Sequence, residues 1–406
     1  MAGEKVIIVT PQIDEEFEEL AKSLSFNIVK IFTFRHYSNE YFVGEGKLKE
    51  IKEFVNENDI DKALFNGKLK SSQWYFLEKE LNIEVMDRIN LIIEIFADRA
   101  KSKEAKLQVD LARLNYQIPV LKEWIHHAKK GEHPGFMAGG EYDVDQYYFL
   151  VQKRIKKIKE EIEKIKKERE ERRKNRSRRG YFLITIAGYT NSGKSQLMKS
   201  LSGEDVIIEN RMFSTLVSRT SKITKIKKRI LITDTVGFIK NLPPWLIEAF
   251  NATLEEIFNA DLIILLLDGS DTIERFKEKL ETDLEILKGV KKDKILPVIN
   301  KIDICTDDLS EKIKVVEEKL NKPNLISAKT GENLDLLLRR IEEMLNYDIE
   351  YNITLPEDKN YMSLLSFIYD YGDIIQLKVN GDINIKFRIN SKFLGEIERL
   401  INYFNQ

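Results

Sequence analysis

The sequence predicts a multidomain α/β protein: an N-terminal α/β unit with a long antiparallel helical hairpin, a doubly wound α/β domain, and a small C-terminal α+β domain. Short apolar runs alternate with amphipathic stretches in two separate regions, which is typical of parallel sheets covered by helices. Two long apolar seams with heptad-like spacing lie between these regions. The chain has 406 residues, too many for one core of roughly 150 residues. We place the boundaries at residues 1–88, 89–179, 180–347 and 348–406.

The average composition does not indicate a nucleic-acid-binding or membrane protein. Lys and Arg number 66 against 67 Asp and Glu, so any basic surface must be local. The N-terminal apolar run is too short for a signal peptide, and residues 262–267, the most apolar stretch, are far fewer than the roughly 20 residues of a membrane span. The single cysteine, Cys305, fits a reducing compartment. We expect a cytoplasmic protein with no membrane partner, and a monomer when free.

The N-terminal 88 residues alternate strand-like and helix-like segments. VIIVT, NIVKIFTF, ALFNG and IEVMDR are the apolar runs, and EEFEELAKSL, KLKEIKEFVNEN and SQWYFLEKEL are the amphipathic ones. This order predicts a small parallel sheet with helices between its strands.

Residues 89–179 change to long helices. One seam consists of Leu107, Leu111, Leu114, Ile118, Leu121 and Ile125, and a second of Ile155, Ile158, Ile162 and Ile165. The segment KKGEHPGFMAGGEYD between them cannot continue a helix, so the helices should fold back as an antiparallel hairpin with an exposed tip. We expect Pro119 to kink the first helix.

The hairpin ends in a basic segment. Residues 153–179 hold 15 Lys or Arg against 6 Glu, and no apolar residue follows Ile165. One interpretation is a solvated helix end and linker. The other, which we favour, is a contact with the phosphate backbone of RNA, since clustered cations release condensed counterions.

The hairpin tip has two further sets of side chains to interpret. His126, His127 and His133 lack a carboxylate or cysteine at metal-site spacing, so a plain surface or tip contacts are favoured over metal binding. The tip also has five aromatic side chains, which either stack on unpaired bases of RNA or pack within the hairpin. The sequence leaves both interpretations open. The five are Trp124, Phe136, Tyr142, Tyr147 and Tyr148.

The third unit opens with a phosphate-binding motif. FLITIAGYTNSGKSQLMKSLSG reads as a buried strand, a GxxxxGKS loop and a helix start, which is the context that the P-loop requires. Backbone amides should wrap the β-phosphate, Lys194 should lie along the β- and γ-phosphates, and the Ser195 hydroxyl should ligate Mg²⁺. The predicted residues are Gly188, Tyr189, Thr190, Asn191, Ser192, Gly193, Lys194 and Ser195.

A second nucleotide element follows about forty residues later. ILITDTVGF is a strand that ends at Asp234, followed by Thr235, Val236 and Gly237. Asp234 should hold Mg²⁺ through a water, and the Gly237 amide should sense the γ-phosphate.

NKID, at residues 300–303, predicts guanine specificity. A carboxylate at Asp303 can accept the N1–H and N2 amino protons of guanine, which adenine does not offer there, so ATP should be rejected. Asn300 should contact the base edge and bridge to the P-loop, and the stem of Lys301 should pack over the ring. The set Asn300, Lys301, Ile302 and Asp303 is completed by Ser327, Ala328 and Lys329, whose backbone should face the guanine carbonyl.

Between the first two elements lies RMFSTLVSR. A threonine hydroxyl here should complete the Mg²⁺ shell when the γ-phosphate is present. We choose Thr215, with Ser214 and Thr220 as alternatives. The predicted contact segment is Phe213, Ser214, Thr215, Leu216 and Val217.

The residue after DTVG bears on the rate of hydrolysis. Many GTPases carry a glutamine there that orients the attacking water, but this chain has Phe238, so we expect slow intrinsic hydrolysis that depends on a partner. Asn191 matches the asparagine of GTPases in which bound K⁺ supplies positive charge. The predicted catalytic residues are Lys194, Asn191 and Gly237, with GTP as substrate, GDP as product, Mg²⁺ as cofactor and K⁺ as a candidate activator.

These motifs together resemble the HflX family of GTPases. The resemblance rests on YFVGEGKLKEI, DRINLIIEIFADRAKSKEAKLQVDLARLNY, GGEYDVD, GYTNSGKS, FSTLV and DTVGF, and it covers nearly all of the chain. It implies that the hairpin and the basic segment at 153–179 dock on the large ribosomal subunit near the peptidyl transferase region. It also implies that GTP controls this association, that stalled ribosomes are split or rescued under stress, and that Ser195 and Thr215 are the Mg²⁺ ligands.

Two departures from the family pattern stand out. The family has a GGPGETQLE-like loop where this chain reads GGEYDVD, and FATLD where it reads FSTLV, which removes a carboxylate. The alternative function is a GTP-gated RNA-binding or RNA-remodelling protein with incidental hydrolysis. A membrane-remodelling GTPase is disfavoured because the helices lack an interfacial apolar face beyond Ile165.

Overall fold

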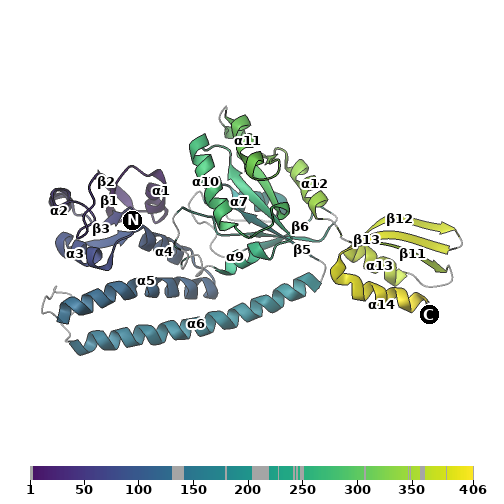
Figure 1. The fold of residues 1–406 in the computed structure, drawn as a ribbon, viewed down its shortest axis with the longest axis horizontal. Coiled ribbons are helices and arrows are strands. Elements are labelled where there is room, and N and C mark those ends of the chain that lie inside the picture. The colour runs from purple at the N-terminus through teal and green to yellow at the C-terminus, as the bar shows by residue number, and fades with distance from the viewer. Residues whose placement is uncertain are drawn as a thin grey trace. The chain divides into compact units, whose positions relative to one another are not determined.

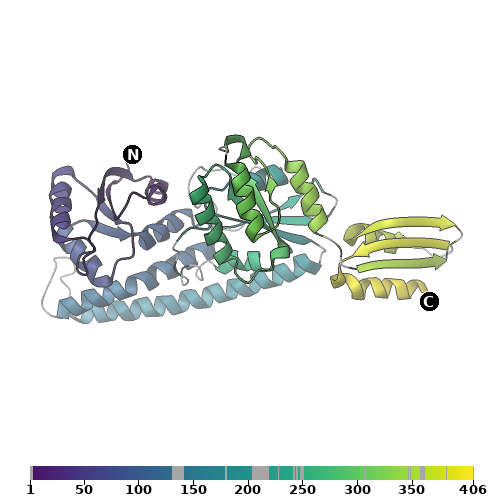
Figure 2. The ribbon, with the colours of Figure 1, turned by 45° about the horizontal axis from the view of Figure 1, so that its top comes forward.

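The computed structural model describes residues 3–129, 141–178, 181–203, 219–226, 228–240, 243, 246, 251–305, 308–345, 347, 349–356, 362–380 and 382–405. Figures 1 and 2 show the described elements from two directions. They form α/β, helical-hairpin and α+β parts, so the predicted fold class is confirmed. No helix among the described residues is long and apolar enough to cross a membrane.

The N-terminal part is a four-stranded parallel sheet with the order β2-β1-β3-β4. Its elements are β1 (Lys5–Thr10), α1 (Glu15–Ser23), β2 (Asn27–Thr33), α2 (Glu45–Asn58), β3 (Lys62–Phe65), α3 (Ser71–Leu81), β4 (Glu84–Asp87) and α4 (Arg88–Arg99). After Lys5 every residue of β1 is buried, as expected for a central strand. Helix α1 begins where the Asp14 carboxylate accepts the amides of Glu16 and Phe17 at 3.0 and 3.3 Å.

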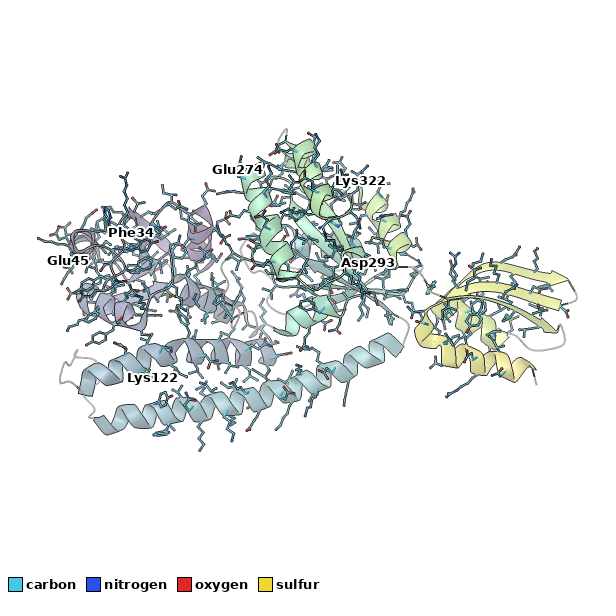
Figure 3. The ribbon with its side chains drawn as sticks, viewed as in Figure 1. Phe34, Glu45, Lys122, Glu274, Asp293 and Lys322 are labelled. Atoms are coloured by element: carbon cyan, nitrogen blue, oxygen red, sulfur yellow. The ribbon has the colours of Figure 1, made fainter. Side chains whose placement is uncertain are left out.

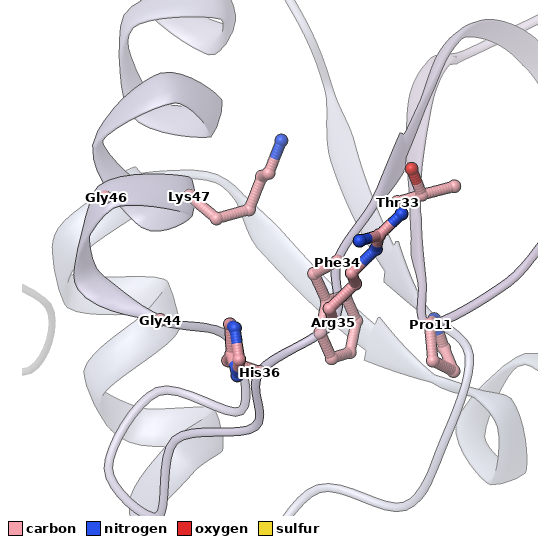
Figure 4. A pocket seen from close by; sticks show the side chains of 8 residues that line it. All are labelled: Pro11, Thr33, Phe34, Arg35, His36, Gly44, Gly46 and Lys47. Atoms are coloured by element: carbon pink, nitrogen blue, oxygen red, sulfur yellow. The ribbon is translucent and has the colours of Figure 1, made fainter.

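A cavity of about 490 Å³ lies beside β1, β2 and the start of α2 in this N-terminal part. It is lined by Pro11, Thr33, Phe34, Arg35, His36, Gly44, Gly46 and Lys47 (Figure 4). The Lys47 ammonium pairs with the Glu50 carboxylate at 2.6 Å. The cavity contains none of the residues that the nucleotide motifs predict.

The hairpin consists of α5 (Lys103–Lys129) and α6 (Glu141–Arg178), which lie side by side in Figures 1 and 2. Ion pairs join Lys103 to Glu161 at 3.1 Å and Arg154 to Asp110 at 3.4 Å. From the first pair to the second, the residue number rises along α5 and falls along α6, so the two helices are antiparallel. Helix α5 runs through Pro119, and the kink predicted there stays a prediction.

The buried carboxylate of Asp87 joins β4, α4 and α5. It accepts the amides of Leu69 and Asn90 at 3.1 and 2.8 Å, together with the hydroxyl of Tyr116. Burial raises the pKa of Asp87, although these donors favour its charged form. The first hairpin helix is thereby fixed to the carboxyl end of the N-terminal sheet.

The second α/β part has a six-stranded sheet with the order β10-β9-β8-β5-β7-β6, in which β6 alone among its described strands is antiparallel to its neighbour. Its strands are β5 (Phe182–Ala187), β6 (Arg219–Ile223), β7 (Ile230–Asp234), β8 (Leu262–Asp268), β9 (Ile295–Asn300) and β10 (Asn324–Leu325). Its helices are α7 (Lys194–Ser202), α9 (Asn251–Phe258), α10 (Ile273–Ile286), η1 (Lys292–Lys294), η2 (Ile302–Ile304), α11 (Leu309–Lys319) and α12 (Leu334–Met344).

The apolar core of the second α/β part holds the strands whose carboxyl-end loops carry the predicted nucleotide-binding residues. Strand β8 is buried over all its residues, and α7 and α12 pack with the sheet in one apolar cluster. Helix α10 carries Glu274 in its first turn (Figure 3), where the helix dipole favours a carboxylate. Because β5, β7, β8 and β9 are parallel neighbours, the loops at their carboxyl ends meet at one edge of the sheet.

The C-terminal part is a three-stranded antiparallel sheet with the order β11-β13-β12. Its elements are β11 (Ile349–Pro356), α13 (Met362–Tyr371), β12 (Gly372–Asn380), β13 (Asp382–Ile389), η3 (Ser391–Phe393) and α14 (Leu394–Asn405). The central strand β13 alternates exposed and buried residues, and its buried face forms an apolar core with α13 and α14. Figure 2 shows α14 running along this sheet.

Candidate nucleotide-binding site

The P-loop runs from Gly188 to Gly193, between the end of β5 and the first residue of α7. Its backbone takes left-handed conformations at Gly188, Asn191 and Gly193, with φ of 139°, 64° and 97°. A Cβ at Gly188 would overlap the carbonyl oxygen of Leu266 in β8. Glycine is therefore required where the loop leaves the sheet, both for its φ and for the close approach of β8.

Lys194 places a cation at the N-terminus of α7. Its side chain is buried, and its ammonium donates to the carbonyl oxygens of Tyr189 and Gly188 at 2.6 and 3.1 Å. Burial lowers the pKa of Lys194 to about 8, whereas the nearby Asp234 carboxylate favours its charged form. The ammonium and the N-terminus of α7 make this loop suited to phosphate.

Ser195 and Asp234 bring two oxygen ligands together. The Ser195 hydroxyl donates to Oδ2 of Asp234 at 2.7 Å, and both side chains are buried. The next residue, Thr235, donates its hydroxyl to the carbonyl of Ile186 at 2.7 Å, which ties the end of β7 to β5. A hydroxyl and a carboxylate are hard oxygen donors of the kind that Mg²⁺ prefers, so these two residues fit that ion.

The segment after Val236 packs directly on the P-loop. A Cβ at Gly237 would come within 2.8 Å of Cα of Thr190 and 2.9 Å of the Lys194 ammonium. The amide of Phe238 donates to the Gly188 carbonyl at 3.0 Å, and the Thr190 amide donates to the Phe238 carbonyl at 2.8 Å. The Phe238 ring is buried. No hydrogen-bonding side chain follows Gly237, so the chain supplies no water-orienting group at this position.

Asn300 links the base-recognition residues to the P-loop. Its Nδ2 donates to the carbonyl of Ser192 at 2.9 Å, and its Oδ1 accepts the amide of Ala328 at 2.9 Å. The bridge to the P-loop that the sequence predicts for Asn300 is thus present in the structure. It holds together two loops whose residues are distant in the chain.

The rest of the NKID segment turns outward at the carboxyl end of β9. Lys301 has a left-handed φ of 63°, and its ammonium pairs with Asp268 at the end of β8 at 2.6 Å. The amide of Ile302 donates to the carbonyl of Ile326 at 3.3 Å. Asp303 follows with an exposed carboxylate. This arrangement leaves a carboxylate available to a base at the mouth of the site.

Ser327, Ala328 and Lys329 form a tight loop beside Asn300. Ser327 and Ala328 are buried, whereas Lys329 is exposed. The Ser327 hydroxyl accepts the amide of Thr330 at 3.1 Å, and the Ser327 carbonyl accepts the amide of Gly331 at 2.9 Å. The structure therefore brings this loop, NKID, the P-loop and Asp234 to one edge of the sheet.

The predicted Mg²⁺-binding segment cannot be compared with this geometry. Residues 213–217, which include Thr215 and the alternative Ser214, lie outside the described residues. The other alternative, Thr220, lies in β6, where its hydroxyl is 3.1 Å from that of Thr233.

The hairpin tip is described only in part. His133 and Phe136 lie outside the described residues, and no side-chain description covers Trp124, His126, His127, Tyr142 or Tyr147. The remaining aromatic residue, Tyr148, has the ammonium of Lys122 at 5.5 Å from its ring centre. Since Lys122 is on the opposite helix, Tyr148 takes part in packing within the hairpin.

Sequence reasoning missed two features near the P-loop. Gln196 and Ser200 of α7 both contact the carbonyl of Ala328. On α10, Asp283 is completely buried beside the P-loop, where the backbone amide of Tyr189 favours its charged form. The signal for the first pair was their spacing of four residues on one face of a helix. The position of Asp283 in the apolar stripe with Phe276 and Leu280 was the signal for the second.

Comparison with known proteins supports the same interpretation. A family of GTP-binding GTPase N-terminal regions matches residues 12–97, a family of GTP-binding GTPase middle regions matches residues 99–176, and the 50S ribosome-binding GTPase family matches residues 183–301. The GTPase HflX of Thermococcus kodakarensis is 39% identical over 399 residues, covering 95% of this chain and 90% of that protein. The GTPase HflX of Methanocaldococcus jannaschii is 39% identical over 390 residues, covering 95% of each chain.

A solved structure is similar over most of the chain. The crystal structure of SsGBP in complex with GDP aligns with a TM-score of 0.53 and 30% identity, covering 84% of this chain and 98% of that chain.

The fold and the site define a P-loop GTPase, with a lysine at the start of α7 and an asparagine that joins the P-loop to the loop around Ala328. The chain binds and hydrolyses GTP. It belongs to the HflX family of GTPases, as its sequence motifs indicated.

Proposed function

We propose that this GTPase acts in the cytoplasm as a monomer that associates with the large ribosomal subunit and splits or rescues stalled ribosomes under stress. The hairpin and the basic segment at 153–179 contact ribosomal RNA, and GTP controls the association. The observation that carries this proposal is a row of exposed cations on α6, at Lys153, Lys156, Lys157, Lys159, Lys164 and Lys167. The match of residues 183–301 to the 50S ribosome-binding GTPase family supports the choice of partner.

The charge on α6 is suited to RNA rather than to holding the hairpin together. The isoleucines of this helix face inward, with Ile155 and Ile158 buried, and the lysines named above point to solvent. Exposed cations gain affinity for RNA by releasing condensed counterions, so binding should weaken steeply as salt rises.

The slow step of hydrolysis is proposed to depend on the ribosome. The side chain of Phe238 is a buried hydrocarbon ring without a hydrogen-bonding group, so it cannot orient the attacking water. A partner that rearranges the segment from Asp234 to Phe238 would therefore raise the rate.

We propose that the site binds Mg²⁺ and K⁺, because the chain supplies oxygen donors for both ions. Ser195 and Thr215 are the direct ligands of Mg²⁺, with Asp234 beside Ser195, and Mg²⁺ supplies positive charge against the phosphates. Asn191, which is exposed at the turn of the P-loop, is the proposed ligand of K⁺. If Na⁺ in place of K⁺ leaves turnover unchanged, the K⁺ assignment is wrong.

The decisive experiment is a GTPase assay with purified large subunits, combined with co-sedimentation in a GTP analogue and in GDP. We expect stimulation of about tenfold or more, which corresponds to about 1.4 kcal/mol of activation free energy, and co-sedimentation that depends on the analogue. A chain that sediments with subunits but shows no stimulation would instead be a GTP-gated RNA-binding protein with incidental hydrolysis.

A matched pair of variants tests the contact surface. Replacement of Lys156, Lys157 and Lys159 on α6 by Glu should abolish co-sedimentation and leave GDP affinity unchanged. The same charge change at the exposed Lys288, Lys291 and Lys292 of the GTPase domain is the control and should have little effect. Equal losses in the two variants would mean that net charge, not α6, governs binding.

A further inference from the structure

Two side chains of the P-loop helix hold one carbonyl group of the base-recognition loop. Nε2 of Gln196 lies 3.3 Å from the carbonyl oxygen of Ala328, and the Ser200 hydroxyl lies 2.8 Å from the same oxygen. The two residues are four apart on α7, so they share one face of the helix. A carbonyl oxygen has two lone pairs, so it can accept from both donors. The single proton of the Ser200 hydroxyl also has the Gln196 carbonyl within 3.0 Å, but the Ala328 carbonyl is nearer.

The other end of the same residue is also fixed. The Ala328 amide donates to Oδ1 of Asn300 at 2.9 Å, and Ala328 is 2% exposed. Both peptide groups that flank Ala328 are therefore held, one by α7 and one by β9. The next amide along the chain belongs to Lys329, and among the described residues none accepts a hydrogen bond from it.

We propose that Gln196 and Ser200 are positioning residues for guanine recognition. By holding the Ala328 carbonyl, they orient the following peptide so that the Lys329 amide faces O6 of the guanine. The proposal rests on the guanine site described above and names the residues that aim its donor. Because both residues belong to the helix whose start binds phosphate, they also set the distance between the phosphate and base parts of the site.

This arrangement separates the two halves of base recognition. Asp303 reads the N1–H and the 2-amino group of guanine, whereas the Lys329 amide reads O6. Loosening the Ala328 carbonyl should weaken the contact to O6 and leave the contacts to Asp303 in place. A general loss of folding would weaken both contacts together.

The test uses three nucleotides that differ at one position of the base. 6-Thio-GDP replaces O6 by sulfur, a weaker acceptor, and keeps both groups that Asp303 reads. IDP keeps O6 and lacks the 2-amino group. The full chain with Gln196→Met, with Ser200→Ala and with both changes is titrated with GDP, 6-thio-GDP and IDP at fixed Mg²⁺ by calorimetry.

In the wild type, GDP should bind more tightly than either analogue. In the double variant, the preference for GDP over 6-thio-GDP should fall by about tenfold, since the Lys329 amide no longer makes its hydrogen bond with O6. The preference for GDP over IDP should stay within about twofold of the wild type. Ser200→Thr, which keeps the hydroxyl, should retain the wild-type preferences, and Asp303→Asn should reduce the preference over IDP instead.

Other outcomes overturn the proposal. If the double variant keeps its preference for GDP over 6-thio-GDP, or if both preferences fall by the same factor, Gln196 and Ser200 have no special role at O6. If the double variant does not fold, as judged by its melting curve, the two single variants are subject to the same criteria. A wild-type chain without any preference for guanine over adenine nucleotides would instead refute the guanine site itself.

Discussion

Gly237 lies so close to the P-loop that a single methyl group can test its role. A Cβ there would meet the backbone of Thr190 and the Lys194 ammonium at 2.8 and 2.9 Å. The segment would have to move, and overpacking of this kind costs about 1–3 kcal/mol. We predict that Gly237→Ala weakens binding of a non-hydrolysable GTP analogue by about tenfold or more, while GDP binding changes little, because the Gly237 amide is expected to contact the γ-phosphate.

The measurement is calorimetric titration of the same variant with both nucleotides. Gly289→Ala is a suitable control, because a Cβ there meets no atom within 4 Å, although its φ of 98° adds some strain. Equal losses for GDP and the GTP analogue would show that Gly237 shapes the P-loop in general and does not distinguish the γ-phosphate.

The pKa of Lys194 predicts a pH dependence of nucleotide binding. Burial lowers this pKa to about 8 in the chain without ligand, and bound phosphates favour the charged form, so they raise it. Below the free pKa the ammonium is already present. Above it, binding must take up a proton, and the affinity falls. We predict that the Kd for GDP rises by about fourfold between about pH 7 and about pH 8.5.

Titration in two buffers with different ionisation enthalpies will reveal the proton uptake, at pH values below the range in which guanine loses its N1–H. In Lys194→Arg the guanidinium stays protonated over this range, so the remaining affinity should not vary with pH. A wild-type Kd that is equal at both pH values would mean that Lys194 is fully charged without ligand.

Among the helices and strands, α10 carries a buried carboxylate, Asp283, beside the P-loop. Burial raises the pKa of Asp283 well above its usual value, although Lys194 and Lys279 favour its charged form. A raised pKa in the folded state means that Asp283 stabilises the fold most when protonated. Its contribution is fully present below the unfolded pKa, about 3.9, and is lost as pH rises through the folded pKa.

We therefore predict that Asp283→Asn becomes more stable relative to the wild type as pH increases from about 4 to about 7, by at most about 1.4 kcal/mol per pH unit. The thermal midpoint of unfolding, measured across this range, provides the comparison. Glu285→Gln, an exposed position on the same helix, should show no such trend. A constant difference between Asp283→Asn and the wild type would mean that Asp283 is charged in the fold.

Among the elements, those with a strong local pattern could be predicted from the sequence. The heptad-like seams predicted the hairpin, and ion pairs such as Lys103 with Glu161 confirm its antiparallel direction. A kink was predicted at Pro119; α5 runs through this residue, and the kink stays a prediction. The motif GxxxxGKS requires a strand before it and a helix after it, and β5 and α7 stand in those places.

Contacts between distant segments could not be predicted in this way. The bonds from Gln196 and Ser200 to Ala328 cross more than a hundred residues of chain, and nothing in the local pattern of α7 specifies them. The same holds for Asp283, whose burial depends on how α10 packs against the P-loop. Such features follow from tertiary packing, which a single sequence encodes only indirectly.

On the scale of the whole molecule, apolar cores of the described residues lie in different parts of the chain. One belongs to the N-terminal sheet, one to the GTPase domain and one to the C-terminal sheet. Each core is built from neighbouring segments, so we predict that scanning calorimetry resolves more than one unfolding transition. GDP at about 100 times its Kd should stabilise the transition of the GTPase domain by about 2.7 kcal/mol.

The unfolding temperature of the N-terminal core should not change when GDP is added. Asp303→Asn serves as the control, because it should remove the shift caused by GDP without changing the melting of the other cores. One transition that moves as a whole with GDP would show that the cores unfold together.

The single amide side chain of Asn300 has a practical consequence for redesign. Its two ends are committed to the Ser192 carbonyl and the Ala328 amide, so the residues predicted to read the base are not an interchangeable module. A transplant of residues 300–303 from another nucleotide-binding protein would bring an asparagine shaped for different neighbours. Converting this site to a new base therefore calls for exchanging the P-loop, the NKID segment and the loop around Ala328 as one set.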